Sequence, residues 1–250
     1  LPFVGATLDL TDNISAYASF ATIFNPQTQT STDLTLIKPI TGDNLEGGLK
    51  GEWFGGRLNA SIAVFQTRQK NTAEQGPTVL VGSALVTTYR GVDAKSQGIE
   101  LEFAGEIAPG LQATGSYTIM KISGENGDPV RTFVPRNLAK LNLSYSPPSF
   151  DRLKFGVSGQ YQSKIFLMPQ VTDAAGVTDY RRNAAGQPIR IDQKGYALVD
   201  LFAKYDITEN LSVSANLKNL TNVKYLQALN YAEGFYGAPR TILGTISLKY

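Results

Sequence analysis

The chain has 250 residues and contains neither cysteine nor histidine. This composition excludes disulfide bonds, thiol or imidazole catalysis, and zinc sites built from Cys and His. With 23 basic and 21 acidic residues the net charge is only +2, and no basic run is interleaved with aromatic residues, so nucleic acid is not an expected partner.

Alternation of apolar and polar residues with a period of two recurs along the chain and predicts β-strands. Between residues 57 and 65, for example, Ile62 and Val64 fall on one face and Asn59 and Ser61 on the other. Several runs reach ten residues, the length of a tilted strand that crosses a bilayer. The pattern predicts about eleven strands, at residues 3–10, 14–24, 44–54, 57–69, 90–104, 111–122, 137–146, 152–166, 195–205, 210–219 and 239–250.

The connections between these strands alternate between short and long. The short ones carry Gly, Pro, Asp or Asn, as tight turns require, and lie at 11–13, 54–56, 105–110, 147–151 and 206–209. The long ones lie at 25–43, 70–89, 123–136, 167–194 and 220–238. Bacterial outer-membrane barrels have short periplasmic turns and long extracellular loops, whereas a Greek-key sandwich has no reason for this alternation.

Aromatic and charged residues occupy opposite faces of the predicted strands. The aromatic residues on the apolar face lie close to short turns or to the C-terminus, where a membrane-interface girdle belongs; they are Trp53, Phe103, Tyr145, Phe155, Tyr205 and Tyr250. The charged residues share the other face, which we expect to meet a wet lumen or a plug; they are Glu46, Lys50, Glu52, Glu100, Glu102, Lys154, Lys204 and Lys218.

The predicted fold is therefore an all-β, transmembrane, antiparallel up-and-down β-barrel. The mean hydropathy of −0.13 does not argue against it, because alternation hides a lipid-facing surface from any average along the sequence. Bacterial barrels close with an even number of strands. An odd count therefore predicts that the chain is a fragment of a larger barrel.

Several segments resemble TonB-dependent outer-membrane receptors. The C-terminal signature of that family is similar to Asn219-Leu220-Thr221-Asn222, to the segment 236–241, and to a last strand that ends in aromatic Tyr250. Other segments are similar to receptors for ferric siderophores of the hydroxamate and pyoverdine type; they lie at 17–20, 24–27, 38–39, 44–51 and 96–100.

The resemblance implies a monomeric barrel of about 22 strands with a plugged lumen, in the bacterial outer membrane and in contact with its lipid. Residues 1–250 would form the C-terminal part of the barrel domain, without the plug, the N-terminal strands or the region that contacts the TonB complex. In this family the loops capture a ferric siderophore, and TonB relays the energy for its import. The chelator's own oxygens hold the iron, so we expect neither a cofactor nor a metal site in the protein.

Ligand contacts are expected among the aromatic and arginine residues of the long connections, because a bulky polar ligand needs aromatic rings and hydrogen-bond donors. These candidates are Tyr89, Arg90, Tyr180, Arg181, Arg182, Tyr231, Phe235 and Tyr236. The alternative for each is ordinary loop packing or a solvated charge. Arg240, beside Pro239 at a strand entrance, is interpreted as structural.

Three alternative functions stay open at this point: a passive porin, an enzyme built on a barrel, and a secreted all-β binding protein. Lipases and proteases on barrels use serine or aspartate with histidine, and this chain has no histidine. We therefore expect no enzymatic activity. Plug sequence upstream would exclude a porin, and solubility without detergent would favour the secreted protein.

Overall fold

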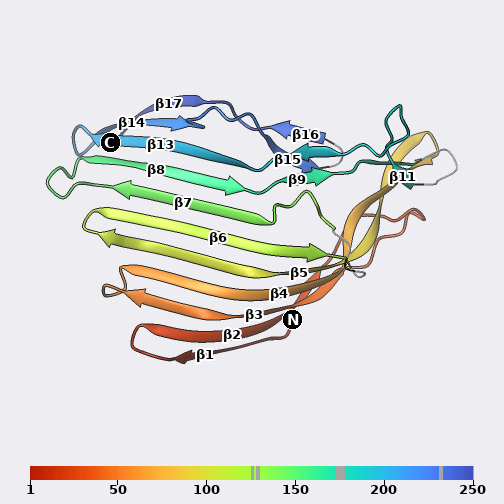
Figure 1. The fold of residues 1–250 in the computed structure, drawn as a ribbon, viewed down its shortest axis with the longest axis horizontal. Coiled ribbons are helices and arrows are strands. Elements are labelled where there is room, and N and C mark those ends of the chain that lie inside the picture. Colours follow the sequence, from red (N-terminus) through yellow and green to blue (C-terminus); the bar gives the residue numbers. More distant parts are fainter. Residues whose placement is uncertain (125–126, 128–129, 173–177, 231–232, 250) are drawn as a thin grey trace.

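The computed structural model describes residues 1–124, 127, 130–172, 178–230 and 233–249. Eleven of its strands form one antiparallel sheet in which neighbours in the sheet follow chain order (Figure 1). These strands are β1 (Phe3–Asp9), β2 (Ile14–Asn25), β3 (Ile40–Trp53), β4 (Leu58–Val81), β5 (Ala84–Ala108), β6 (Leu111–Ser123), β7 (Asn137–Tyr145), β8 (Leu153–Gln162), β13 (Tyr196–Asp206), β14 (Leu211–Lys218) and β17 (Thr241–Leu248). The predicted all-β meander of eleven strands is confirmed.

Six shorter strands pair in three hairpin-like sheets within the C-terminal connections. They are β9 (Ile165–Leu167) with β12 (Ile191–Gln193), β10 (Gln170–Thr172) with β11 (Thr178–Tyr180), and β15 (Leu226–Asn230) with β16 (Glu233–Tyr236). Among the described residues no helix is long and apolar enough to cross a membrane.

The connections lie at alternate ends of the sheet, with the short turns at the left of Figure 1 and the longer segments at the right. The turn between β3 and β4 shows how a short connection forms: Phe54, Gly55 and Gly56 all have positive φ, at 57°, 67° and 80°. Glycine adopts these angles without steric cost, so the pair Gly55-Gly56 permits the tight reversal. Within the described strands, β1 and β17 are the two edges of the sheet.

One face of the sheet is apolar and fully accessible. Val64 pairs with Ile99 and Ile62 with Leu101 across β4 and β5, and these side chains are exposed rather than packed in a core. On the last strand, Ile246 is 77% exposed. In a membrane this surface meets hydrocarbon, whereas in water so large an apolar patch would promote association.

The opposite face is polar, and the strand register places the eight predicted charged residues on it together. Tyr17 donates a hydrogen bond from its hydroxyl to Glu46 Oε1 at 2.6 Å, and the Lys50 ammonium lies 4.4 Å from the centroid of the Tyr17 ring. Nearby, the Thr118 hydroxyl donates to Glu100 Oε1 at 2.8 Å. The charges on this face therefore have polar neighbours, which supports its prediction as a lumen wall.

The predicted girdle aromatics lie where the sequence placed them, near the short turns. The rings of Tyr145 and Phe155 meet edge to face with centroids 5.8 Å apart, and Tyr205 stacks on Phe150 at 5.9 Å. Trp53 and Phe103 cover the glycines Gly51 and Gly115, where an added Cβ would strike their rings. Tyr250 lies outside the described residues, and the interfacial role of this group stays a prediction.

The predicted long loop at 70–89 is wrong. Strand β4 continues to Val81 and β5 starts at Ala84, so the two form one long hairpin whose turn contains Gly82, at φ 62°. Register shifts lie at 69–72 and 75–78. Each shift breaks the period-two alternation, which is why the sequence pattern indicated a loop there.

Strand boundaries differ elsewhere by a few residues. β3 starts four residues earlier than predicted, at Ile40, and the predicted strand 152–166 is divided between β8 and β9. The predicted loops 167–194 and 220–238 contain the other five short strands, β10, β11, β12, β15 and β16.

Asn219 holds the connection between β14 and β17 in place. Its side chain is 3% exposed, its Nδ2 donates to the carbonyls of Val223 (2.9 Å) and Ala238 (3.1 Å), and its Oδ1 accepts from the Val223 N–H (2.8 Å). Its backbone N–H donates to Asp200 Oδ1 on β13 at 2.7 Å. The residue has a φ of 49°, a conformation that asparagine tolerates better than most residues. One side chain thus bonds both ends of the connection that leads into the last strand.

We predict that Asn219→Ala destabilises the intact receptor by about 2 to 4 kcal/mol, because it leaves an N–H and two carbonyls without their partner and places alanine at positive φ. The midpoint of denaturant-induced unfolding in detergent micelles measures the effect. Asn210→Ala, in an exposed turn, is the control and should change stability by no more than about 0.5 kcal/mol. Equal unfolding midpoints for the two variants would show that the Asn219 side chain does not stabilise the connection into the last strand.

Candidate ligand-binding surface at the loop end

A two-stranded ribbon rises from the sheet at the end with the long connections. Pairing of β4 with β3 stops at Lys70, and pairing of β5 with β6 stops at Lys95, so residues 71–94 pair only with each other. Arms of this length extend roughly 35 Å at about 3.3 Å per residue. In Figure 1 the ribbon bends toward β11, at the far side of the loop end.

The loop 26–39 fastens the base of this ribbon. Gln27 donates from Nε2 to the carbonyls of Lys38 and Asn71, both at 2.7 Å, and its Oε1 accepts the N–H of Ala73 at 3.1 Å. Further along, the Tyr89 N–H donates to the Thr30 carbonyl at 2.8 Å. An isolated two-stranded hairpin is marginally stable in water. The loop therefore supplies tertiary contacts that the ribbon needs.

The loop 26–39 is itself ordered by a carboxylate. Asp33 accepts hydrogen bonds from the Ser31 hydroxyl and from the hydroxyl and N–H of Thr35, the Thr35 hydroxyl at 2.9 Å. The bond from Ser31, followed by those from Thr35, lowers the pKa of Asp33 below its usual value. The charged carboxylate is thus the form that holds this turn.

Tyr89 and Arg90 both lie on β5 within the ribbon, and not in a loop as predicted. Neighbouring residues of a strand point to opposite faces, so the side chains of Tyr89 and Arg90 cannot contact a ligand on the same face of the ribbon. Arg90 is opposite Glu74 on β4, and their side chains form an ion pair at 3.7 Å. The Arg90 side chain is 61% exposed, so this pair leaves most of the guanidinium accessible.

The candidates Tyr180, Arg181 and Arg182 lie at and just after β11. The Arg181 N–H donates to the carbonyl of Pro169 at 2.8 Å, and Arg182 Nη1 donates to the carbonyl of Gly186 at 2.8 Å. The partner strand β10 packs against β4 of the ribbon. The segment 180–182 is thus linked through β10 to the ribbon that carries Tyr89 and Arg90, although the two segments are about ninety residues apart in sequence.

Phe235 and Tyr236 form a second group on β16. They are 60% and 66% exposed, and the Lys224 ammonium lies 5.0 Å from the Tyr236 ring centroid. Their hairpin packs on β9 through β15, above a small core in which the rings of Tyr196 and Tyr225 meet at 4.4 Å. Tyr231 lies outside the described residues.

Sequence reasoning missed one aromatic and basic cluster in the same region. The Arg190 guanidinium lies 3.9 Å from the centroid of the Phe166 ring and forms an ion pair with Asp192 at 2.8 Å. Arg190 lies in the predicted long connection 167–194, so the rule that selected Arg181 could have selected it too. Phe166 was assigned to the predicted strand 152–166, which removed it from consideration.

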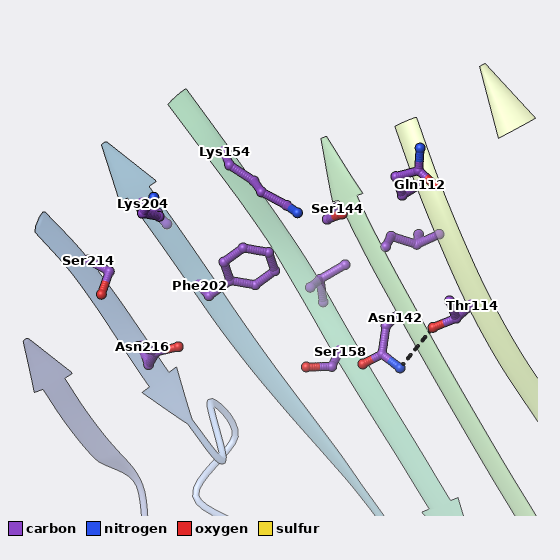
Figure 2. Close-up of a pocket in the computed structure, with 13 residues that line it drawn as sticks. Gln112, Thr114, Asn142, Ser144, Lys154, Ser158, Phe202, Lys204, Ser214 and Asn216 are labelled. Atoms are coloured by element: carbon purple, nitrogen blue, oxygen red, sulfur yellow. Dashed lines mark hydrogen bonds between the residues drawn. The ribbon is translucent and has the colours of Figure 1, made fainter. Parts of the chain in front are cut away.

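The polar face also carries two open hollows of about 430 and 490 Å³, both nearer to the short turns. Figure 2 shows side chains from neighbouring strands lining the first, including Lys154, Phe202 and Asn216. There Asn142 on β7 donates a hydrogen bond from Nδ2 to the Thr114 hydroxyl on β6 at 3.3 Å, which links the two neighbouring strands. Across the part of the chain that the structure describes, no group of carboxylates is arranged to hold a metal ion.

Residues 1–220 match the profile of a family described as "TonB dependent receptor-like, beta-barrel". The chain is 35% identical over 253 residues to the ferripyoverdine receptor of Pseudomonas aeruginosa, which covers 97% of this chain and 29% of that protein. It is 29% identical over 260 residues to the ferrioxamine B receptor of Salmonella typhimurium, which covers 98% of this chain and 33% of the relative.

The fold is also similar to a solved structure, the ferripyoverdine receptor of the Pseudomonas aeruginosa outer membrane bound to ferripyoverdine. The TM-score is 0.81 at 34% identity, with 99% of this chain and 32% of that chain covered. The chain thus spans about a third or less of the length of the proteins that it matches.

We predict that Gln27→Ala loosens the ribbon, because the substitution removes two hydrogen bonds between the loop 26–39 and the ribbon base and a third within the loop. Amide hydrogen exchange in residues 71–94 of the intact receptor should accelerate by about tenfold, the equivalent of one or two lost hydrogen bonds. Gln75→Ala, an exposed position on the ribbon itself, is the matched control and should exchange like the native protein. Unchanged exchange in Gln27→Ala would mean that the ribbon is held by other contacts.

Proposed function

Because the chain belongs to the TonB-dependent receptor-like β-barrel family, whose members are outer-membrane proteins, we propose that it forms part of a receptor that binds a ferric siderophore outside the cell and imports it. The chain covers only about a third or less of its relatives, so the activity of the whole receptor is proposed rather than read from this chain. The relatives are transport receptors, and we propose no catalytic role for the chain.

The contact of the strand pair β10 and β11, through β10, with β4 of the ribbon is the observation that carries this proposal. Arg90 lies on the ribbon, and Arg181 and the ring of Tyr180, which is 41% exposed, belong to the strand pair that contacts it, so all three would face the extracellular end of the barrel. Aromatic rings and fixed hydrogen-bond donors suit a bulky ligand with many oxygen atoms. In a ferric siderophore the chelator surrounds the iron, so the protein supplies contacts to the chelator and no metal ligands.

The class of cargo follows from the relatives. Four relatives at 30% to 35% identity are receptors named for pyoverdines, and a receptor named for ferrioxamine B, a hydroxamate, is also similar. We propose a pyoverdine-type or hydroxamate chelate as the cargo. A passive porin is not favoured by these relationships, and a secreted protein in water would not expose an apolar face as extensive as the one on this sheet.

The remaining partners are proposed from the family. Energy would come from the TonB complex through a region outside this chain, and the plug would rest against the polar face. We propose that residues 1–250 contribute the C-terminal part of the barrel domain and that the complete barrel is monomeric. No cofactor is proposed, since the iron travels as part of the ligand.

We predict that the double substitution Arg90→Ala and Tyr180→Ala in the full-length receptor weakens ferric pyoverdine binding by about tenfold or more, because it removes one charged and one aromatic contact. Titration of the purified receptor with the ferric chelate, followed by quenching of the receptor's tryptophan fluorescence, measures the affinity. Phe235→Ala with Tyr236→Ala tests the second group in the same way.

The matched control is Tyr161→Ala with Arg152→Ala, which removes the same residue types from the lipid-facing surface and from a short turn. It should bind within about twofold of the native receptor, as expected for sites remote from the ligand. Native affinity in both loop-end variants would exclude the proposed contact surface.

A further inference from the structure

Four cations, three of them on adjacent positions of neighbouring strands, lie on the outward, lipid-facing side of the sheet at its extracellular end. Arg68 on β4 is directly opposite Lys95 on β5. Lys121 on β6 is opposite Gln97, the next outward residue along β5, and is therefore diagonal to Lys95. Lys70 follows Arg68 at the next outward position on β4. We call Arg68, Lys95 and Lys121 the outer basic cluster.

The register shows that this cluster forms the upper border of the apolar face. Val64, Ile99 and Ile119 make one apolar row across β4, β5 and β6, followed by a row with glutamines and then by Arg68 and Lys95. Lys95 is eight residues from Phe103, which lies near the opposite border. A tilted strand rises roughly 20 Å over that length, comparable with the height of about 25 Å of the apolar surface of outer-membrane barrels. The cluster therefore lies at the level of the outer headgroups.

These cations are poorly compensated by the protein. Like charges directly opposite each other on a sheet repel, so the pair of Arg68 and Lys95 calls for a nearby anion. Asp43 on β3 is opposite Arg68, and Asp93, two residues before Lys95 on β5, accepts a hydrogen bond from the Asn71 N–H. Over the described ranges none of the cluster's side chains forms an ion pair with these or any other carboxylates. Arg68 and Lys121 are exposed, and Lys95 is half-buried.

We propose that the outer basic cluster binds the phosphate groups of the phosphorylated glycolipid in the outer leaflet, namely lipid A. Arginine forms bidentate hydrogen bonds with phosphate, and lysine contributes a point charge. Long basic side chains at the border of an apolar surface reach the headgroups while their stems stay against the acyl chains. The inference depends on the membrane location of the family and is independent of the identity of the cargo.

The test compares the full-length receptor with the triple variant Arg68→Gln, Lys95→Gln, Lys121→Gln in detergent. Bound lipid is counted by native mass spectrometry after addition of purified diphosphorylated lipid A. Each basic side chain near an anionic surface strengthens association by roughly fivefold, so the variant should bind about a hundredfold more weakly. Lipid A without its phosphates should bind the native receptor as weakly as the variant binds the intact lipid.

The control Arg57→Gln, Arg152→Gln, Lys249→Gln removes the same charge from the short-turn end and should retain lipid A like the native receptor. Inorganic phosphate should displace the lipid no better than chloride of equal ionic strength. If the triple variant does not fold, Lys95→Gln alone should lose about fivefold. The proposal would be overturned if the variant in use retained lipid A as well as the native receptor does, or if the native receptor bound the dephosphorylated lipid as well as the intact one. It would also be overturned if the control lost as much lipid A as the variant, or if inorganic phosphate displaced the lipid better than chloride does.

Discussion

Inside a bilayer every backbone N–H and C=O group needs a hydrogen-bond partner, and this need governs the arrangement of the chain. Hydrocarbon offers no hydrogen bonds, so a sheet that crosses it must pair each strand with its neighbours. The ladder from β1 to β17 meets this need throughout the sheet except at its two edges. The same pairing fixes which side chains face lipid and which face the lumen, so the position of the girdle, the charged wall and the loop end all follow from it.

Much of the fold could be predicted because period-two alternation is a direct consequence of that pairing. Residues such as Ile62 and Ser61 report their faces without any tertiary information. The signal fails where the backbone departs from regular pleating. In the ribbon, the register shifts at 69–72 and 75–78 mask strand structure that the hydrogen bonds show plainly. The prediction missed the short strands β10 to β12 for another reason, since three residues are too few to display a period.

The candidate site was harder to predict, because its residues come together through contacts between distant loops. Composition selected Tyr89 and Arg90 as a pair, whereas the strand places them on opposite faces. Nothing local in the sequence indicates that β10 packs on the ribbon. The contact of Arg190 with the Phe166 ring depends on the pairing of β9 with β12, which has no clear sequence pattern. The outer basic cluster, by contrast, depends only on register, and strands assigned correctly would have been enough to find it.

The register shifts also restrict how the ribbon can vary in length. Between Gln69 and Thr72 one strand has one residue more than the other, with Asn71 at φ 59° as part of the irregular step. Removing that extra residue would restore regular pairing and leave Glu74 and the buried Thr72 opposite Arg90 and Val92, on the side that they occupy now. Removing a residue elsewhere in the strand would instead exchange the inner and outer sides of everything beyond it. Single-residue insertions and deletions in related receptors should therefore gather at these two steps, whereas elsewhere in the arm they should come in pairs of residues.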